Sequence, residues 1–193
     1  MRLIKIGTET GCILFETESG NIKAKGYVSG DVMKYFEVFY PDGKKGIFGL
    51  VSNSISRLDY PMSKISDLHG NAIEYRYMDS DNRSYIIGVM YNGSAMINFS
   101  YEDSPTPITA FIAGKQIVRK KRLTKIMSQF GSAKLGDYSF KYILYNNRSL
   151  LSEVGFSNGS NSLNPLRFYY GEGAVASRMD KSETKLTEWY KSN

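Results

Sequence analysis

The sequence contains few of the residue types on which catalytic and metal sites depend. One histidine, His69, and one cysteine, Cys12, occur in 193 residues. A single histidine excludes a Ser-His-Asp or Cys-His arrangement within this chain, and a single cysteine excludes an internal disulfide framework. Cys12 lies in the apolar run 12–15, which favours a buried and unreactive thiol. The sequence therefore predicts no catalytic, cofactor-binding or metal residues.

Long hydrophobic runs are also missing. No apolar stretch approaches the roughly 20 residues that a membrane-spanning helix needs, so no membrane span is predicted. Residues 1–6 are too short and too charged to act as a signal peptide. Asp79, Asp81 and Asn82 superficially suggest a calcium loop, but the glycine and distal glutamate of that motif are absent. We expect a solvated hairpin tip there.

Charge of one sign is only modestly in excess, with a formal net charge of +6. The basic residues include the run 119–122, flanked by Lys115 and Lys125. A nucleic-acid-binding domain normally adds a recognisable module or a much stronger basic balance. We therefore expect a charged face or strand edge that discourages aggregation, and no nucleic-acid partner.

Proline is scarce (5 residues), whereas glycine (18), tyrosine (15) and phenylalanine (10) are plentiful, a balance typical of short strands joined by tight turns. Residues 64–77 show the pattern most clearly. His69, Gly70 and Asn71 are expected to supply the positive-φ residues of a hairpin turn. After this turn, Tyr75 and Tyr77 fall on one face of a predicted strand.

The same alternation predicts further hairpins at 11–28, 35–50, 85–102 and 149–171, and a strand at 138–145. Asp42 and Gly43 are the expected turn residues of the second hairpin, and Asn92 and Gly93 those of the third. Two prolines at 105 and 107 are expected to interrupt pairing in a longer connection. Residues 115–127 fit a strand with a solvated basic face, although a helix also fits their spacing.

Most alternating segments end in an aromatic-x-aromatic pair, and these pairs are separated by 24, 41 and 28 residues. This spacing indicates a degenerate repeat of about two strands per unit, with an insertion in one unit. A single hairpin is marginally stable, so neighbouring units must share a buried face. The predicted core residues are Tyr75, Tyr77, Phe99, Tyr101, Phe140, Tyr142, Phe168 and Tyr170.

We therefore expect an all-β protein: an antiparallel meander of consecutive hairpins that forms a strongly curved sheet, roll or open barrel. Residues 1–175 are expected to form one β domain. The polar residues 176–193 are expected to form a tail or a linker to a further domain.

Residues 60–77 (YPMSKISDLHGNAIEYRY) resemble a segment of the SpvB-like proteins, of the insecticidal toxin-complex B components and of the YD-repeat (Rhs) proteins. The order of the later segments 97–102, 121–126, 149–151 and 164–170 is similar too, so the resemblance covers about residues 35–171. The Tyr-Asp signature of the YD repeats is absent, and the repeats are irregular.

The resemblance implies a structural shell or scaffold segment of a larger secreted or surface protein that presents or encloses another domain. It implies partners within the same parent polypeptide, an extracellular or cell-surface location, and no active site in these residues. One alternative is a glycan- or lipid-binding β module with an aromatic-lined concave face, since aromatic rings on a sheet suit carbohydrates. An enzyme, supported by no motif, is the third class.

Overall fold

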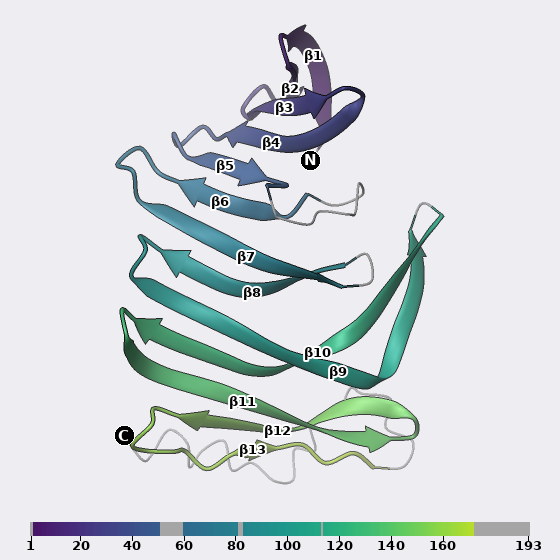
Figure 1. Ribbon diagram of the computed structural model, residues 1–193, viewed down its shortest axis with the longest axis vertical. Coiled ribbons are helices and arrows are strands. Elements are labelled where there is room, and N and C mark those ends of the chain that lie inside the picture. Colours follow the sequence, from purple (N-terminus) through teal and green to yellow (C-terminus); the bar gives the residue numbers. More distant parts are fainter. Residues whose placement is uncertain (1, 51–59, 81–82, 113, 172–193) are drawn as a thin grey trace.

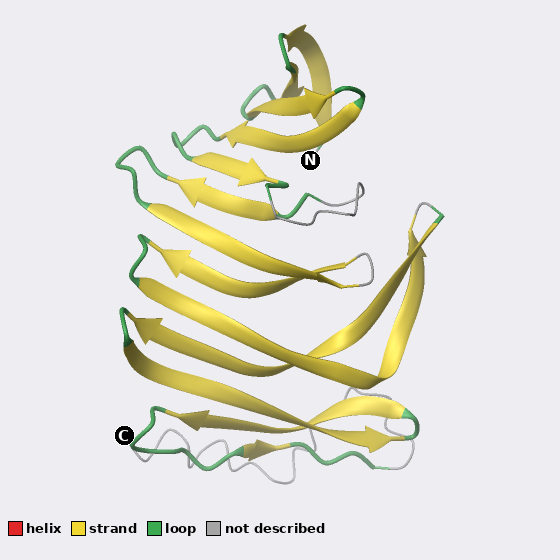
Figure 2. Cartoon of the chain, in the orientation of Figure 1, coloured by secondary structure: helices red, strands yellow, loops and turns green. Residues whose placement is uncertain are grey.

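All described strands belong to one antiparallel sheet whose order in space is their order in the chain (Figure 1). The computed structural model describes residues 2–50, 60–80, 83–112 and 114–171. Strands and loops account for all of this part of the chain, and β1 and β13 are not paired with each other (Figure 2). The prediction of an all-β meander that does not close is confirmed. The predicted tail 176–193, residues 52–59 and Asp81–Asn82 lie outside the described residues.

The strands are β1 Leu3–Glu9, β2 Cys12–Thr17, β3 Lys23–Ser29, β4 Val32–Phe39, β5 Lys45–Phe48, β6 Met62–Ser66, β7 Ala72–Ser80, β8 Arg83–Tyr91, β9 Ala95–Ile112, β10 Lys115–Phe130, β11 Ala133–Tyr145, β12 Arg148–Ser157 and β13 Leu166–Arg167.

Two regions differ from the expectations in an informative way. The alternative of a helix at 115–127 is wrong, because these residues pair along β9 as β10. Pro105 and Pro107 interrupt the pairing as expected, but the expected longer connection is wrong, because both prolines lie inside β9. Proline has no N–H to donate to a ladder, and a central strand tolerates it only where the ladder is broken. Four residues, 104–107, stand opposite the single residue Lys120 at this point.

The turns contain residues with a positive φ, several of them at predicted positions. Gly43, Gly70, Asn92 and Gly93 all have positive φ. The expectation that His69 and Asn71 also adopt positive φ is wrong, since among these three residues only Gly70 does so.

Asp67 holds this turn instead. Its Oδ1 accepts the backbone N–H groups of His69 at 2.8 Å and of Asn71 at 2.9 Å. Its Oδ2 accepts the side-chain amide of Asn71 at 2.8 Å. The hydrogen bond from the Asn71 side chain, followed by the two backbone bonds, lowers the pKa of Asp67.

The sheet is a single layer, and its core is correspondingly thin. The buried apolar residues are Cys12, Ala24, Val38 and Tyr85, and no large side chain in the described part is fully buried. The predicted burial of Cys12 is confirmed. An ordinary domain of this length packs two layers around one core. Both faces of this sheet are therefore only partly removed from water.

Four tyrosines tie neighbouring strands together in one repeated way. Each is the second aromatic of a predicted pair, and each hydroxyl donates to a backbone carbonyl of a strand earlier in the chain. The bonds run from Tyr77 to Met62 (2.9 Å), from Tyr101 to Ile86 (2.7 Å), from Tyr142 to Leu123 (2.7 Å) and from Tyr170 to Leu151 (2.6 Å).

In every case the accepting residue directly precedes the extra residue of a β-bulge. These extra residues are Ser63, Ile87, Thr124 and Ser152. A bulge breaks the ladder and leaves a backbone group without its cross-strand partner. The tyrosine hydroxyl gives the carbonyl beside each bulge a hydrogen-bond donor.

β9 and β10 extend well beyond their neighbours. β8 pairs with β9 only up to Asn98, and β11 pairs with β10 only from Lys125 onward. The remaining parts bend at residues 104–107 and project from the sheet as a two-stranded arm, defined here as 104–112 and 115–120 (Figure 1). The arm lies within the longest spacing between aromatic pairs and explains the predicted insertion.

Candidate functional site

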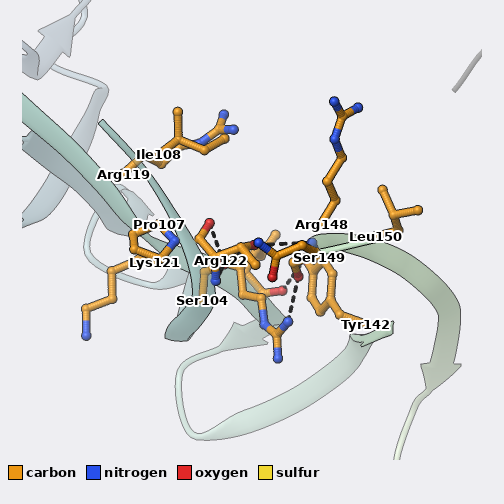
Figure 3. Close-up of a pocket in the computed structure, with 13 residues that line it drawn as sticks. Ser104, Pro107, Ile108, Arg119, Lys121, Arg122, Tyr142, Arg148, Ser149 and Leu150 are labelled. Carbon is orange, nitrogen blue, oxygen red and sulfur yellow. Dashed lines mark hydrogen bonds between the residues drawn. The ribbon is translucent and has the colours of Figure 1, made fainter. Parts of the chain in front are cut away.

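A hollow of about 670 Å³ lies where the arm leaves the sheet. Residues from three segments line it: 104–108 of β9, 119–123 of β10 and 147–150 at the start of β12. Tyr142 of β11 completes the lining (Figure 3). The hollow lies beside the break in the β9–β10 ladder at residues 104–107, where β9 leaves the main sheet (Figure 1).

The turn between β11 and β12 is fastened to this bend by two hydrogen bonds. The backbone N–H of Ser149 donates to Oγ1 of Thr106 at 3.2 Å. Nη1 of Arg122 donates to Oγ of Ser149 at 2.6 Å (Figure 3). Asn146 and Asn147 both have positive φ, which lets two residues reverse the chain here. These bonds therefore fix the position of the start of β12, one wall of the hollow, relative to β9 and β10, the other wall.

The side chain of Arg122 contacts residues of β9, β11 and β12. Besides Ser149, its Nε donates to a carboxylate oxygen of Glu102 at 2.6 Å. Its guanidinium lies 4.7 Å from the centroid of the Tyr142 ring, a cation–π contact. Burial raises the pKa of Tyr142, and the nearby positive charge of Arg122 opposes that rise. Arg122 is thus occupied by partners within the chain.

The remaining charges of the hollow are all positive. Lys121 pairs with Asp103 at 2.8 Å, and its side chain points away from Arg122 in Figure 3. Arg119 and Arg148 are exposed, and neither pairs with a carboxylate anywhere in the described part of the chain. Arg119 comes from β10 and Arg148 from β12, and Figure 3 shows them on two sides of the hollow.

The lining of the hollow is strongly positive. The lining contains four cationic side chains and, among the described residues, no aspartate or glutamate. Glu102 and Asp103 neutralise two of these cations from outside the lining, which leaves Arg119 and Arg148. No cluster of three or more histidine, cysteine, aspartate or glutamate side chains that could hold a metal ion occurs in the part of the chain that the structure describes.

The eight predicted core aromatics lie along β7, β9 and β11 and just beyond β13, and all are half-buried. The structure brings only Tyr142 into the hollow. His69 lies in an exposed turn, as predicted. That these eight rings provide most of the stability of the sheet stays a prediction.

Sequence reasoning singled out the basic run 119–122 but missed the second wall. Arg148 and Ser149 follow Asn146-Asn147, a pair of residues that tolerate positive φ and signal a tight turn. That signal predicts a hairpin, but only the fold shows that its turn meets the bend in β9.

Comparisons with known proteins give fold relatives only. No family model matches the sequence, and no curated protein matches it. A crystal structure of TcdB2-TccC3 superposes with a TM-score of 0.66 at 12% identity, over 88% of this chain and 13% of that chain. The N-terminal domain of effector protein SpvB from Salmonella typhimurium strain LT2 superposes with a TM-score of 0.65 at 9% identity, over 86% and 78%.

The Photorhabdus luminescens Tc holotoxin pore is a third similar structure, with a TM-score of 0.63 at 12% identity, over 88% of this chain and 12% of that chain. The chain therefore spans about an eighth of the length of the two toxin-complex chains. The predicted resemblance to SpvB-like and toxin-complex proteins is confirmed at the level of the fold. No helix in the described part has the length and apolarity to cross a membrane.

Proposed function

We propose that this chain is a segment of a β-sheet shell in a larger polypeptide, where it presents or encloses another domain. The observation that carries the proposal is the single-layer sheet, in which no large side chain of the described part is fully buried. A sheet needs another layer on its apolar face to become a stable domain. Such a layer would come from other parts of the same polypeptide.

The fold relatives support this reading. In TcdB2-TccC3 and in the Tc holotoxin pore, the matching segment is 13% and 12% of a much longer chain. In SpvB it lies within the N-terminal domain of an effector protein. By analogy, we propose partners within the same polypeptide and an extracellular or cell-surface location, with a YD-repeat-like relationship between the hairpin units.

The proposal assigns no catalysis to this chain. Its one histidine lies in a turn, and the hollow at the arm holds cations without a carboxylate to act as a general base. Any enzymatic activity of the larger protein would reside in another domain.

The first test is the reading frame around this sequence. The proposal requires it to encode further domains, and a frame that encodes this chain alone would contradict it. The second test is hydrogen exchange of the isolated chain and of the larger polypeptide. We expect the amides of β9 to β12 to exchange more slowly in the larger polypeptide, because another layer covers the sheet. Equal rates would show that nothing covers this face.

A glycan- or lipid-binding module stays the alternative prediction. It requires aromatic side chains that are free to stack on a ligand, whereas the one aromatic of the hollow, Tyr142, is already used by Arg122 and Leu123. A glycan array and a lipid-extraction experiment test it directly. Saturable binding that is lost when exposed Tyr91 or Tyr169 is replaced by Ala would favour this alternative.

A further inference from the structure

We propose that the hollow at the base of the arm is a docking site for an extended acidic peptide segment that also carries apolar side chains. This inference depends on the charges and walls of the hollow alone, so it stands or falls independently of the shell proposal.

The charge of the hollow defines the first property of its occupant. Arg122 and Lys121 have carboxylate partners, Glu102 and Asp103. Arg119 and Arg148 have none in the described part of the chain, although they flank the same space (Figure 3). Guanidinium groups bind carboxylates through paired hydrogen bonds. Two unpaired arginines on opposite walls therefore favour a ligand with at least two separated carboxylates.

The apolar lining defines the second property. Pro107 and Ile108 come from the arm and Leu150 from β12, and the side chain of Ile108 is 52% exposed. A hollow of about 670 Å³ is much larger than one phosphate or sulfate ion. Its walls therefore suit a ligand that places apolar groups between its charges, as a peptide of alternating acidic and apolar residues does.

The hydroxyl groups of the hollow take part in hydrogen bonds within the chain. Oγ of Ser149 accepts from Arg122, and Oγ1 of Thr106 accepts from the backbone of Ser149. Oγ of Ser104 accepts the backbone N–H of Thr106. Phosphate sites usually offer several free backbone and hydroxyl donors at one point. Arg119 and Arg148 instead come from two different strands, which favours a ligand with separated charges over a single phosphate.

The position of the arm explains why such a site would be useful. The hydrogen bond between Thr106 and Ser149 joins the arm to the start of β12, and Arg122 of β10 adds a second bond to Ser149. A peptide that bridges Arg119 on the arm and Arg148 on the turn would join the same two walls a second time. Docking of a segment from a partner protein would thus also fix the direction of the arm.

Fluorescence anisotropy with the intact chain tests the proposal. The probe is a short fluorescein-labelled peptide in which glutamate alternates with leucine. We expect saturable binding that weakens as salt is raised, since ions screen the arginines. Replacing every glutamate by serine, or every leucine by serine, should weaken binding strongly. Equal affinity of the all-serine-for-glutamate peptide would overturn the proposal.

The matched variants are Arg119→Gln/Arg148→Gln and, as a control with the same charge change, Lys5→Gln/Lys23→Gln. Lys5 and Lys23 are exposed on β1 and β3, far along the sheet from the hollow (Figure 1). We expect the arginine variant to bind about tenfold more weakly, since two exposed ion pairs with the peptide are lost, and the lysine variant to bind like the parent.

Equal loss in both variants would show general attraction to a basic protein and would overturn the proposal. Heparin and inorganic phosphate serve as competitors. Binding of heparin with no binding of the acidic peptide would assign the hollow to sulfated glycans instead. Circular dichroism of each variant confirms that the sheet is retained.

Discussion

The hydroxyl of Tyr142 donates to the backbone carbonyl of Leu123 at 2.7 Å, and both residues line the hollow at the arm. Leu123 precedes the bulged residue Thr124, so its carbonyl lies where the ladder is broken. Tyr101, the cross-strand partner of Leu123, makes the equivalent bond to Ile86. The cross-strand pair of Leu123 and Tyr101 therefore stands between two tyrosine hydrogen bonds, one from Tyr142 to Leu123 and one from Tyr101 to Ile86.

Replacement of Tyr142 by Phe should destabilise the chain by about 1–2 kcal/mol, because it removes the hydroxyl that donates to the half-buried carbonyl of Leu123. The ring and its contact with Arg122 are retained, so the change isolates the hydroxyl. Urea titration followed by circular dichroism measures the loss. Tyr138→Phe is the control, since that residue is 47% exposed and no bond of its hydroxyl is seen in the described part. Equal stability of Tyr142→Phe and the parent would contradict the role of the bond.

Replacement of Tyr101 or Phe140 by Ala should cost about 2–3 kcal/mol. A fully buried aromatic would cost more, but both side chains are only half-buried in this single-layer sheet. Phe111→Ala on the arm is the control, because Phe111 is 71% exposed and its removal should change the stability very little. A loss below about 1 kcal/mol at both sheet positions would reject their assignment to the core.

The carboxyl of Asp137 should make the stability depend on pH. It is 8% exposed and pairs with Lys134 and Lys125, which lower its pKa below the ordinary 3.8. A lowered pKa stabilises the fold above the unfolded value, and this stabilisation is lost as the pH falls through the folded value. Asp137→Asn should therefore cost about 1–2 kcal/mol at neutral pH.

The difference between Asp137→Asn and the parent should shrink as the pH is lowered below about 4, where the unfolded carboxyl becomes protonated. Urea titrations at several pH values measure it. Asp31→Asn, in the exposed turn before β4, is the matched control. A difference that is constant from neutral to acid pH would refute the ion-pair explanation.

Replacement of Asp67 by Ala should lower the thermal midpoint, because three donors of the β6–β7 turn lose their acceptor. Replacement of His69 by Ala should leave it nearly unchanged, since only the backbone N–H of His69 takes part. Differential scanning calorimetry of the two variants provides the comparison. The reverse order, with His69→Ala the more damaging change, would contradict this account of the turn.

The hairpins could be predicted because their signals are local. Asn92-Gly93 has positive φ at both residues, and Gly43 follows Pro41-Asp42 in the same way. The Asp67 turn was predicted at the right place but for a partly wrong reason. A carboxylate that accepts nearby backbone N–H groups allows His69 and Asn71 to keep ordinary φ.

The bend of β9 was harder to predict, because proline signals broken pairing without saying how the chain continues. In this structure Pro105 and Pro107 lie inside a strand of 18 residues, since β10 pairs with β9 on both sides of the unpaired residues 104–107. The tyrosine hydrogen bonds could not be predicted either. The sequence shows the ring of Tyr142, but not the bulge at Thr124 that lies beside its acceptor, the carbonyl of Leu123.

By itself, the sequence determined an all-β chain of successive hairpins, because alternation and turn chemistry act between residues that are close along the chain. Only the tertiary structure decided that the sheet stays open in one layer, and that Arg119 and Arg148 flank one hollow. These features depend on contacts between residues far apart in sequence, such as Ser149 with Thr106, which no local pattern encodes.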